Sequence, residues 1–259
     1  MVLRDTDKAA LWRDGIAKFP GVVPPDKVAA ALRAINASLG SEGIDPEKLP
    51  TFRAQSYAPE VTRTSVITDL LTATPMWDIA QEAIGADMIE PVSSGQIALR
   101  FPSMDEPHDP HPHIDGMYTP LNGVKKGTIA NFTALVGVFL SDVPQPYAGN
   151  FTVWPGTHRR YAEYFRERGP QSLLEGMPEV ELPEPMQVTA KAGDAVLCHY
   201  QVGHGIAGNA SPHTRYAIFF RLHRKGHDEI RWECMTDIWR EWDGMRDVVE
   251  EAERAAAKA

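Results

Sequence analysis

From about residue 88 onward, the chain consists of short apolar or alternating stretches separated by turn-forming residues. This pattern limits the available folds more than any other feature. The separators include proline, glycine and asparagine clusters, such as those at 144–146 and 208–209. Many short strands punctuated in this way are typical of a barrel or sandwich. The predicted strands cover 96–101, 132–140, 150–154, 195–200 and 216–222, with 228–234 as a further candidate.

The first 90 residues are instead predicted to be mainly helical. Trp12, Ile16 and Phe19 recur at helical spacing, and a Pro-Gly pair follows them. Two further predicted helices begin at prolines and end at Gly40 and Gly85. A glutamate- and alanine-rich tail over 247–259 predicts one more helix.

These patterns predict one domain, mainly β with flanking helices. We assign 1–87 to a mostly helical buttress, 88–235 to the β core and 236–259 to a helical tail. The length of 259 residues fits one large barrel or sandwich domain.

The amino-acid composition limits the kinds of partner that we expect for this protein. The 26 lysines and arginines are outnumbered by 35 acidic residues, giving a formal net charge of −9. This balance argues against a nucleic-acid partner, because phosphate backbones attract clustered basic residues. No apolar run approaches the roughly 18 residues needed to span a membrane. Asp5 and Asp7 interrupt the start where a signal peptide needs apolar residues, and the two cysteines form no CxxC pair. We therefore expect a cytoplasmic protein with neither nucleic-acid nor membrane partners.

The tightest cluster of chemistry-bearing residues is His113-Ile114-Asp115. In an extended segment, residues two apart point to the same face, so an imidazole and a carboxylate would converge. A third metal ligand must come from elsewhere, and His204, close behind the predicted strand at 195–200, is the best candidate. Two histidines and one carboxylate form the ligand set of non-haem Fe(II) oxygenases. By itself, however, an HxD tripeptide is common by chance.

Arg215 lies 11 residues after His204 and begins an otherwise apolar strand. One interpretation is a surface ion pair. The other is a bidentate clamp for a carboxylate inside the barrel. A dicarboxylate could then chelate a metal at one end and bind Arg215 at the other.

The order of these motifs resembles the phytanoyl-CoA dioxygenase family over nearly the whole chain. The resemblance is carried by the HxD at 113–115, a Gly-strand-Pro-Gly-Thr-His segment at 149–158, the Gly-Asp strand start at 193–194, the distal His204 and Arg215. Members of this family are Fe(II)- and 2-oxoglutarate-dependent oxygenases.

The resemblance implies a double-stranded β-helix, the cupin-like jelly-roll, with helices buttressing one sheet. It implies that His113, Asp115 and His204 bind Fe(II) and that Arg215 pairs with the distal carboxylate of the cosubstrate 2-oxoglutarate. Further cosubstrate contacts would come from the matching positions Gln96, Asn131 and Thr133. Some relatives have a serine or threonine two places after the arginine, where this chain has alanine.

The retained Asp115 also bears on the reaction. Halogenating relatives have a small residue at this position, so hydroxylation, desaturation or oxidative ring closure is expected instead. With O2 as cosubstrate, we expect a polar small molecule or natural product as substrate, and an oligosaccharide antibiotic undergoing orthoester formation is one such case. The polar residues that favour this over an acyl-CoA are His111, Tyr118, Asn122, His158 and Arg159.

Three alternatives stay open. A cupin-like metal-dependent isomerase or lyase could use the same ligands without 2-oxoglutarate, although Arg215 would then have no role. A hydroxylase of an acyl-CoA or an amino acid belongs to the same family. A catalytically silent binding domain would not need all three ligands and the arginine. The GxGxxG at 203–208 does not indicate a dinucleotide site, because a loop rather than a helix follows it.

Overall fold

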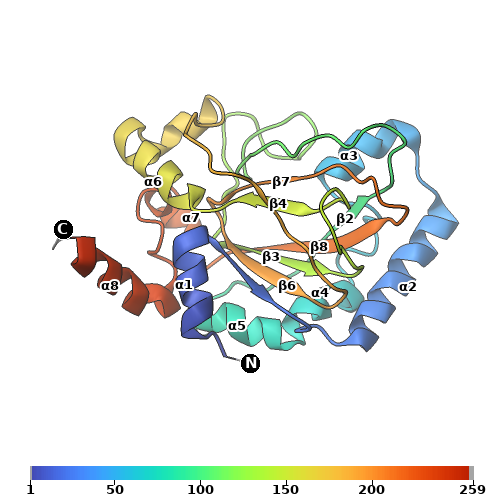
Figure 1. Cartoon of the computed structure of the whole chain (residues 1–259), viewed down its shortest axis with the longest axis horizontal. Coiled ribbons are helices and arrows are strands. Elements are labelled where there is room, and N and C mark those ends of the chain that lie inside the picture. Colours follow the sequence, from blue (N-terminus) through green and yellow to red (C-terminus); the bar gives the residue numbers. More distant parts are fainter. Residues whose placement is uncertain (1, 257–259) are drawn as a thin grey trace.

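Two antiparallel sheets form the centre of the protein in the computed structural model, which describes residues 2–256 (Figure 1). The larger sheet has the strand order β1 (Ile16–Phe19), β6 (Ala195–His199), β3 (Ala134–Phe139), β8 (Arg215–Leu222) and β2 (Gln96–Arg100). The smaller sheet has the order β5 (Met186–Gln187), β4 (Phe151–Trp154) and β7 (Gly203–Ile206). The predicted jelly-roll with flanking helices is confirmed.

The central strands of the larger sheet are apolar on both faces, because each face packs against a different layer. Along β3, Val136 and Val138 face the helices, whereas Leu135 and Phe139 face the smaller sheet. The same alternation continues along β8 and β2. Strands buried on both faces appear in the sequence as continuous apolar runs, which is why these segments could be predicted.

Helices cover the outer face of the larger sheet, where α4 and α5 lie along it (Figure 1). Of these, α5 begins after Thr74 and ends before Gly85, as predicted. The helices are α1 (Asp5–Asp14), α2 (Pro25–Glu42), α3 (Leu49–Ala54), α4 (Ser65–Thr72), α5 (Pro75–Ile84), α6 (Thr157–Arg168), α7 (His227–Ile230) and α8 (Arg246–Ala256). Short 3-10 turns are η1 (Pro46–Lys48), η2 (Pro170–Leu174), η3 (Glu233–Met235) and η4 (Asp243–Met245).

Three details of the predicted secondary structure are wrong. The first helix ends at Gly15, whose left-handed φ of 79° stops α1, and the next four residues pair with β6 as a strand. The second helix continues through Gly40 and ends before Gly43. The segment 228–234 forms helical turns instead of a strand, and residues 257–259 of the predicted tail helix lie outside the described residues.

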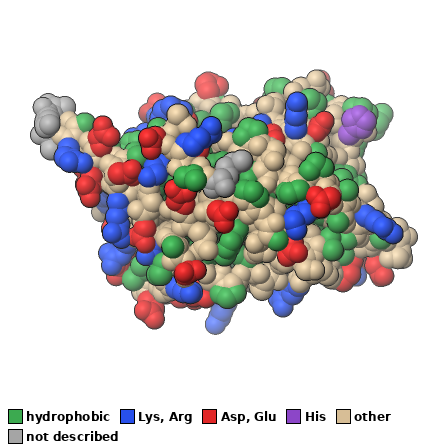
Figure 2. Space-filling model, turned by 90° about the horizontal axis from the view of Figure 1, so that it is seen from below, with side chains coloured by type: hydrophobic (Ala, Val, Ile, Leu, Met, Phe, Trp, Pro, Cys, Tyr) green, Lys and Arg blue, Asp and Glu red, His purple; other side chains and the backbone are tan. Residues whose placement is uncertain are grey.

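The face seen from below carries acidic and basic side chains in an interspersed arrangement (Figure 2). Among the described residues, no helix is long and apolar enough to cross a membrane.

The buried carboxylate of Asp194 joins three segments at the start of β6. It accepts hydrogen bonds from the backbone N–H of Gly21 (2.9 Å) and of Lys191 (3.0 Å), and it pairs with the Lys18 ammonium at 3.0 Å. Burial raises the pKa of Asp194, but these hydrogen bonds and the Lys18 charge outweigh it, so the pKa lies below its ordinary value.

A depressed carboxyl pKa stabilises the fold above the ordinary pKa of about 3.9, and this contribution is lost as the pH falls through the folded value. We expect Asp194→Asn to lower the free energy of unfolding at pH 7 by about 1–3 kcal/mol. Urea unfolding of both proteins should show this difference shrinking below about pH 4. A difference that stays constant down to the acid transition would contradict this role for the charge, and the exposed Asp105→Asn serves as control.

Candidate metal centre

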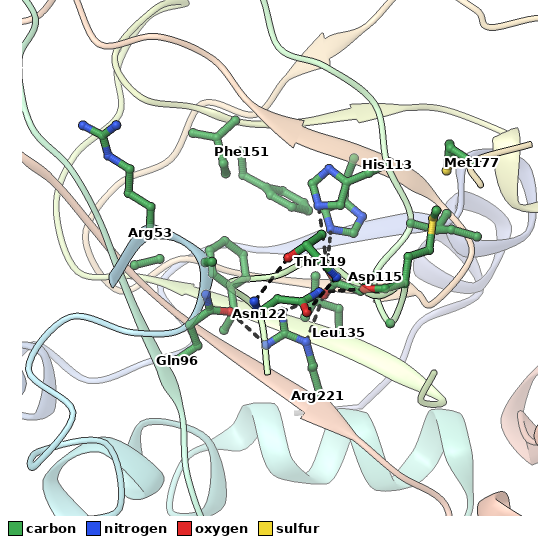
Figure 3. Close-up of a pocket in the computed structure, with 18 of the residues that line it drawn as sticks. Arg53, Gln96, His113, Asp115, Thr119, Asn122, Leu135, Phe151, Met177 and Arg221 are labelled. Carbon is green, nitrogen blue, oxygen red and sulfur yellow. Dashed lines mark hydrogen bonds and ion pairs between the residues drawn. The ribbon is translucent and has the colours of Figure 1, made fainter. Parts of the chain in front are cut away.

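A cavity of about 400 Å³ opens between the two sheets. Its walls come from β2, β8 and β3 of the larger sheet and from β4 and β7 of the smaller one (Figure 3). The loop at 113–122 and the end of α3 form its rim. The lining is largely apolar, with Leu135, Phe151 and Phe219 among the buried side chains.

His113 and His204 face each other through a backbone bridge. The N–H of each residue donates to the carbonyl of the other, both at 2.9 Å, and the imidazole centroids lie 4.5 Å apart. Directly opposite residues in an antiparallel pair point to the same face. Although 91 positions separate the two residues in the sequence, the bridge therefore places both imidazoles on one side of the cavity.

Asp115 completes a cluster with the two histidines. Its Oδ1 lies 3.6 Å from His113 Nε2 and 3.7 Å from His204 Nε2. His204 Nδ1 contacts the Val202 carbonyl at 3.0 Å, which turns Nε2 of that ring toward the aspartate. A contact of this kind on the other ring nitrogen is typical of metal-binding histidines.

The separations between these three atoms suit ligands arranged around one divalent ion. They exceed hydrogen-bond length, and the three donors are of the kinds that bind Fe(II). A second cluster, of His227, Cys234 and Glu241, differs in this respect, because His227 Nδ1 lies 2.8 Å from Glu241 Oε2 in a direct hydrogen-bonded pair. The donors present at 113, 115 and 204 therefore fit an iron ion.

Arg221 holds the other oxygen of Asp115. Its Nε and Nη2 lie 2.9 and 2.7 Å from Oδ2, and its Nη1 donates to Gln96 Oε1 at 2.8 Å. Burial raises the pKa of Asp115, but the charge of Arg221 and the two imidazoles outweigh burial and hold that pKa well below its ordinary value. With Oδ2 occupied, Oδ1 is the oxygen directed at the imidazoles. The predicted residue Gln96 thus lies in the cavity and contacts Arg221.

Arg215 is 1% exposed, lies at the opposite end of β8 from Arg221, and is not among the residues that line the cavity. Its Nε donates to the Gly149 carbonyl (2.8 Å) and its Nη1 to the Ala98 carbonyl (2.9 Å), whereas its Nη2 is buried with no partner. Burial and the neighbouring charge of Arg100 lower the pKa of Arg215 well below its ordinary value. A buried cation with an unused donor is suited to receive a carboxylate, and the role of Arg215 toward 2-oxoglutarate stays a prediction because Arg215 does not line the cavity.

Asn131 and Thr133, which were predicted to contact the cosubstrate, are not among the residues that line the cavity. Both side chains turn away from the cavity, because the chain bends at Thr133 before β3 begins. Thr133 Oγ1 donates to Glu241, while Asn131 Nδ2 donates to the Arg231 carbonyl. The two residues share a face, as expected, but the segment after β8 covers that face.

The polar residues that favoured a polar substrate in the sequence separate into two groups. Tyr118 and Asn122 line the cavity, whereas His111 and Arg159 are not part of its lining. His158 is completely buried beneath α1, where its Nε2 lies 3.1 Å from the Trp12 carbonyl.

Sequence reasoning missed Arg53, Arg100 and Arg221, all of which line the cavity. A signal for Arg221 was present, because it lies six residues after Arg215 and the period of two along a strand places both on one face. Arg100 pairs directly with Arg215 across β2 and β8, a register that only the structure gives.

Gly205 allows the strand bearing His204 to approach the segment bearing His113. A Cβ at position 205 would lie 2.4 Å from the carbonyl oxygen of His111, which belongs to the backbone. We expect Gly205→Ala to push the two segments apart and to weaken Fe(II) binding by at least about tenfold, comparable to losing a residue that orients a metal ligand. Isothermal titration under anaerobic conditions measures this.

The control for this substitution is Gly40→Ala within α2, where nothing lies within 4 Å of the added Cβ. It should stabilise the protein by about 0.5–1 kcal/mol and leave Fe(II) affinity unchanged. Equal Fe(II) affinities in the Gly205→Ala variant and the unsubstituted protein would show that the close approach does not position the ligands.

The fold and these ligands define a jelly-roll metalloenzyme of the oxygenase type. The family model for phytanoyl-CoA dioxygenase (PhyH) matches residues 11–217, and the chain belongs to this family. It is therefore an Fe(II)- and 2-oxoglutarate-dependent dioxygenase that acts on a small molecule with O2, and the predicted enzyme class and cofactors are confirmed. A comparison with curated proteins gives no match.

Several solved structures share the fold. The 2-oxoglutarate-dependent carbocyclase SnoK from nogalamycin biosynthesis is 21% identical, with a TM-score of 0.58 over 85% of this chain and 83% of SnoK. The epimerase SnoN from the same pathway is 19% identical, with a TM-score of 0.56 over 85% of this chain and 80% of SnoN. HygX from Streptomyces hygroscopicus, with nickel and 2-oxoglutarate bound, is 16% identical, with a TM-score of 0.57 over 86% of this chain and 88% of HygX.

Proposed function

We propose that this enzyme oxidises a C–H bond of a polar small molecule or natural product, by hydroxylation or oxidative ring closure, with release of succinate and CO2. The observation that carries this proposal is the convergence of His113, Asp115 and His204 on one wall of the cavity between the two sheets. Orthoester formation on an oligosaccharide antibiotic is the narrower form of the proposal. Its support is that structural relatives such as SnoK come from antibiotic biosynthesis.

In this proposal each residue has a separate task. His113, Asp115 and His204 hold Fe(II), which supplies the oxidising chemistry with O2 and 2-oxoglutarate. Arg221 fixes Asp115 so that a single carboxylate oxygen faces the metal. Arg215 receives the distal carboxylate of 2-oxoglutarate through its unused Nη2. The apolar walls, including Phe151 and Phe219, limit the access of water to one side of the reacting centre, while the side chain of His113 is 50% exposed.

The proposal is tested by incubating the protein with Fe(II), 2-oxoglutarate and O2 and measuring succinate. We expect succinate to form slowly without substrate and faster when a polar natural product that fits the cavity is added. A cupin-like isomerase or lyase would consume no 2-oxoglutarate. No succinate under any condition, from a protein that binds Fe(II), would therefore favour that alternative.

A further inference from the structure

Two arginines in the cavity have no acidic partner. Arg53 lies in the last turn of α3 and Arg100 at the end of β2, and both line the cavity. Arg100 Nη1 donates to the backbone carbonyl of Leu99 at 2.9 Å. Across residues 2–256, the cavity's ion pair joins Arg221 to Asp115, and neither Arg53 nor Arg100 takes part in one.

Two of the uncharged polar side chains around the cavity, those of Asn122 and Gln96, are already engaged. Asn122 donates to the Met117 carbonyl at 2.6 Å and accepts from the backbone N–H groups of Thr119 and Val124, both at 3.1 Å, so it serves its own loop. Gln96 is held by Arg221. The charged groups left free to meet a ligand are therefore the guanidinium groups of Arg53 and Arg100.

The positive charges of the arginines in this region repel one another. Arg100 stands directly opposite Arg215 in the register of β2 and β8, and a Cβ on Gly149 would lie 2.9 Å from the Cβ of one and 3.2 Å from that of the other. Burial lowers the pKa of Arg100, Tyr57 opposes this, and the charge of Arg53 lowers it further. Arg53 is exposed, whereas Arg100 is half-buried; a partly buried cation without a counter-ion is costly, and an anion bound at Arg100 removes that cost.

The net charge of the side chains that line the cavity is positive. Three guanidinium groups line it, against the single carboxylate of Asp115. Fe(II) together with doubly charged 2-oxoglutarate adds no net charge, so an excess of two positive charges remains among the lining residues, and of three when Arg215 is counted with the cosubstrate. This excess occurs in a chain whose formal net charge is −9.

We propose that Arg53 and Arg100 bind an anionic group of the substrate, either a carboxylate or a phosphate ester. This inference rests on the proposed function, because it assigns the cosubstrate to Arg215 and leaves these two arginines to the molecule that is oxidised. The substrate then lies with its anionic group between α3 and the end of β2 and its reacting carbon toward His113 and His204. Its middle part crosses the apolar walls.

The test compares three ligands of similar shape by isothermal titration into protein that is loaded with Fe(II) and saturating 2-oxoglutarate under anaerobic conditions. Benzoate and phenyl phosphate are the anionic probes, and benzyl alcohol is the neutral one. Since charge-assisted hydrogen bonds are worth about 1.5–3 kcal/mol, at least one anion should bind roughly tenfold or more tightly than benzyl alcohol. Which anion binds more tightly shows whether the group is a carboxylate or a phosphate.

Arg53→Gln and Arg100→Gln should each remove most of that preference. Arg168→Gln, an exposed substitution at the end of α6, should not change it. The proposal is overturned if neither anion binds more tightly than benzyl alcohol, or if both cavity variants keep the preference. It is also overturned if Arg100→Gln weakens binding of 2-oxoglutarate instead, because the anion would then be the cosubstrate.

The visible absorption band of an iron-2-oxoglutarate chelate distinguishes a failure of this inference from a failure of the proposed function. Its presence with no preference for anions rejects only this inference. Its absence from protein that binds Fe(II) rejects the proposed use of 2-oxoglutarate.

Discussion

Asp115→Ala is expected to weaken Fe(II) binding by about 100-fold or more and to abolish succinate formation. The substitution removes the only anionic ligand, whereas loss of a residue that merely orients a ligand already costs about 10–100-fold in metal affinity. It also leaves the Arg221 guanidinium facing the two imidazoles without the carboxylate that it now contacts at 2.7 Å.

Thermal unfolding with and without metal measures the same effect independently of turnover. At a free Fe(II) concentration 100 times Kd, bound metal should stabilise the unsubstituted protein by about 2.7 kcal/mol. Asp115→Ala should gain almost nothing at that concentration. Asp105→Ala, an exposed carboxylate in the loop leading to the HxD, is the matched control and should behave like the unsubstituted protein. Metal-dependent stabilisation that survives in Asp115→Ala would place the iron elsewhere.

Arg215→Lys is expected to raise the Kd for 2-oxoglutarate by about 30-fold or more while Fe(II) affinity stays the same. Truncating one partner of a buried hydrogen-bonded charge pair costs about 2–5 kcal/mol. Lysine keeps the charge but lacks the planar fork, so it cannot retain the contacts to the Gly149 and Ala98 carbonyls and also reach a carboxylate.

The measurement for this variant is an anaerobic titration with 2-oxoglutarate at saturating Fe(II). Fe(II) affinity and circular dichroism verify that the variant is folded, and Arg33→Lys on the exposed surface of α2 controls for the substitution itself. If folded Arg215→Lys binds 2-oxoglutarate as tightly as the unsubstituted protein, Arg215 is a structural residue that supports two backbone carbonyls.

The parts of the fold that could be predicted are those in which a local pattern matches the final environment. The predicted stretch at 132–140, which has no polar side chain from 134 onward, contains β3, and both faces of β3 are buried. Thr74 and Gly85 bound α5 because the chemistry of helix ends is local. Strand β7 was not predicted, because two of its four residues are glycines and give no strand pattern. It forms through pairing with β4.

The metal ligands could be proposed from the sequence for a similar reason. An HxD places two donors together through local geometry alone, and the order of the family motifs supplied the third. Asn131 and Thr133 lie outside the cavity lining, because they precede β3 at a bend in the chain. Arg53 could not be foreseen, because it reaches the cavity from a short helix about 60 residues before the HxD in the sequence, and no spacing rule connects the two.

Joint binding of Fe(II) and 2-oxoglutarate is tested by an anaerobic titration of metal-free protein with both, followed by visible absorption. We predict a charge-transfer band that appears only when both are present and that Asp115→Ala lacks. Tight Fe(II) binding without any band would contradict the account. In that case His113, Asp115 and His204 would still hold a metal, but 2-oxoglutarate would not chelate it.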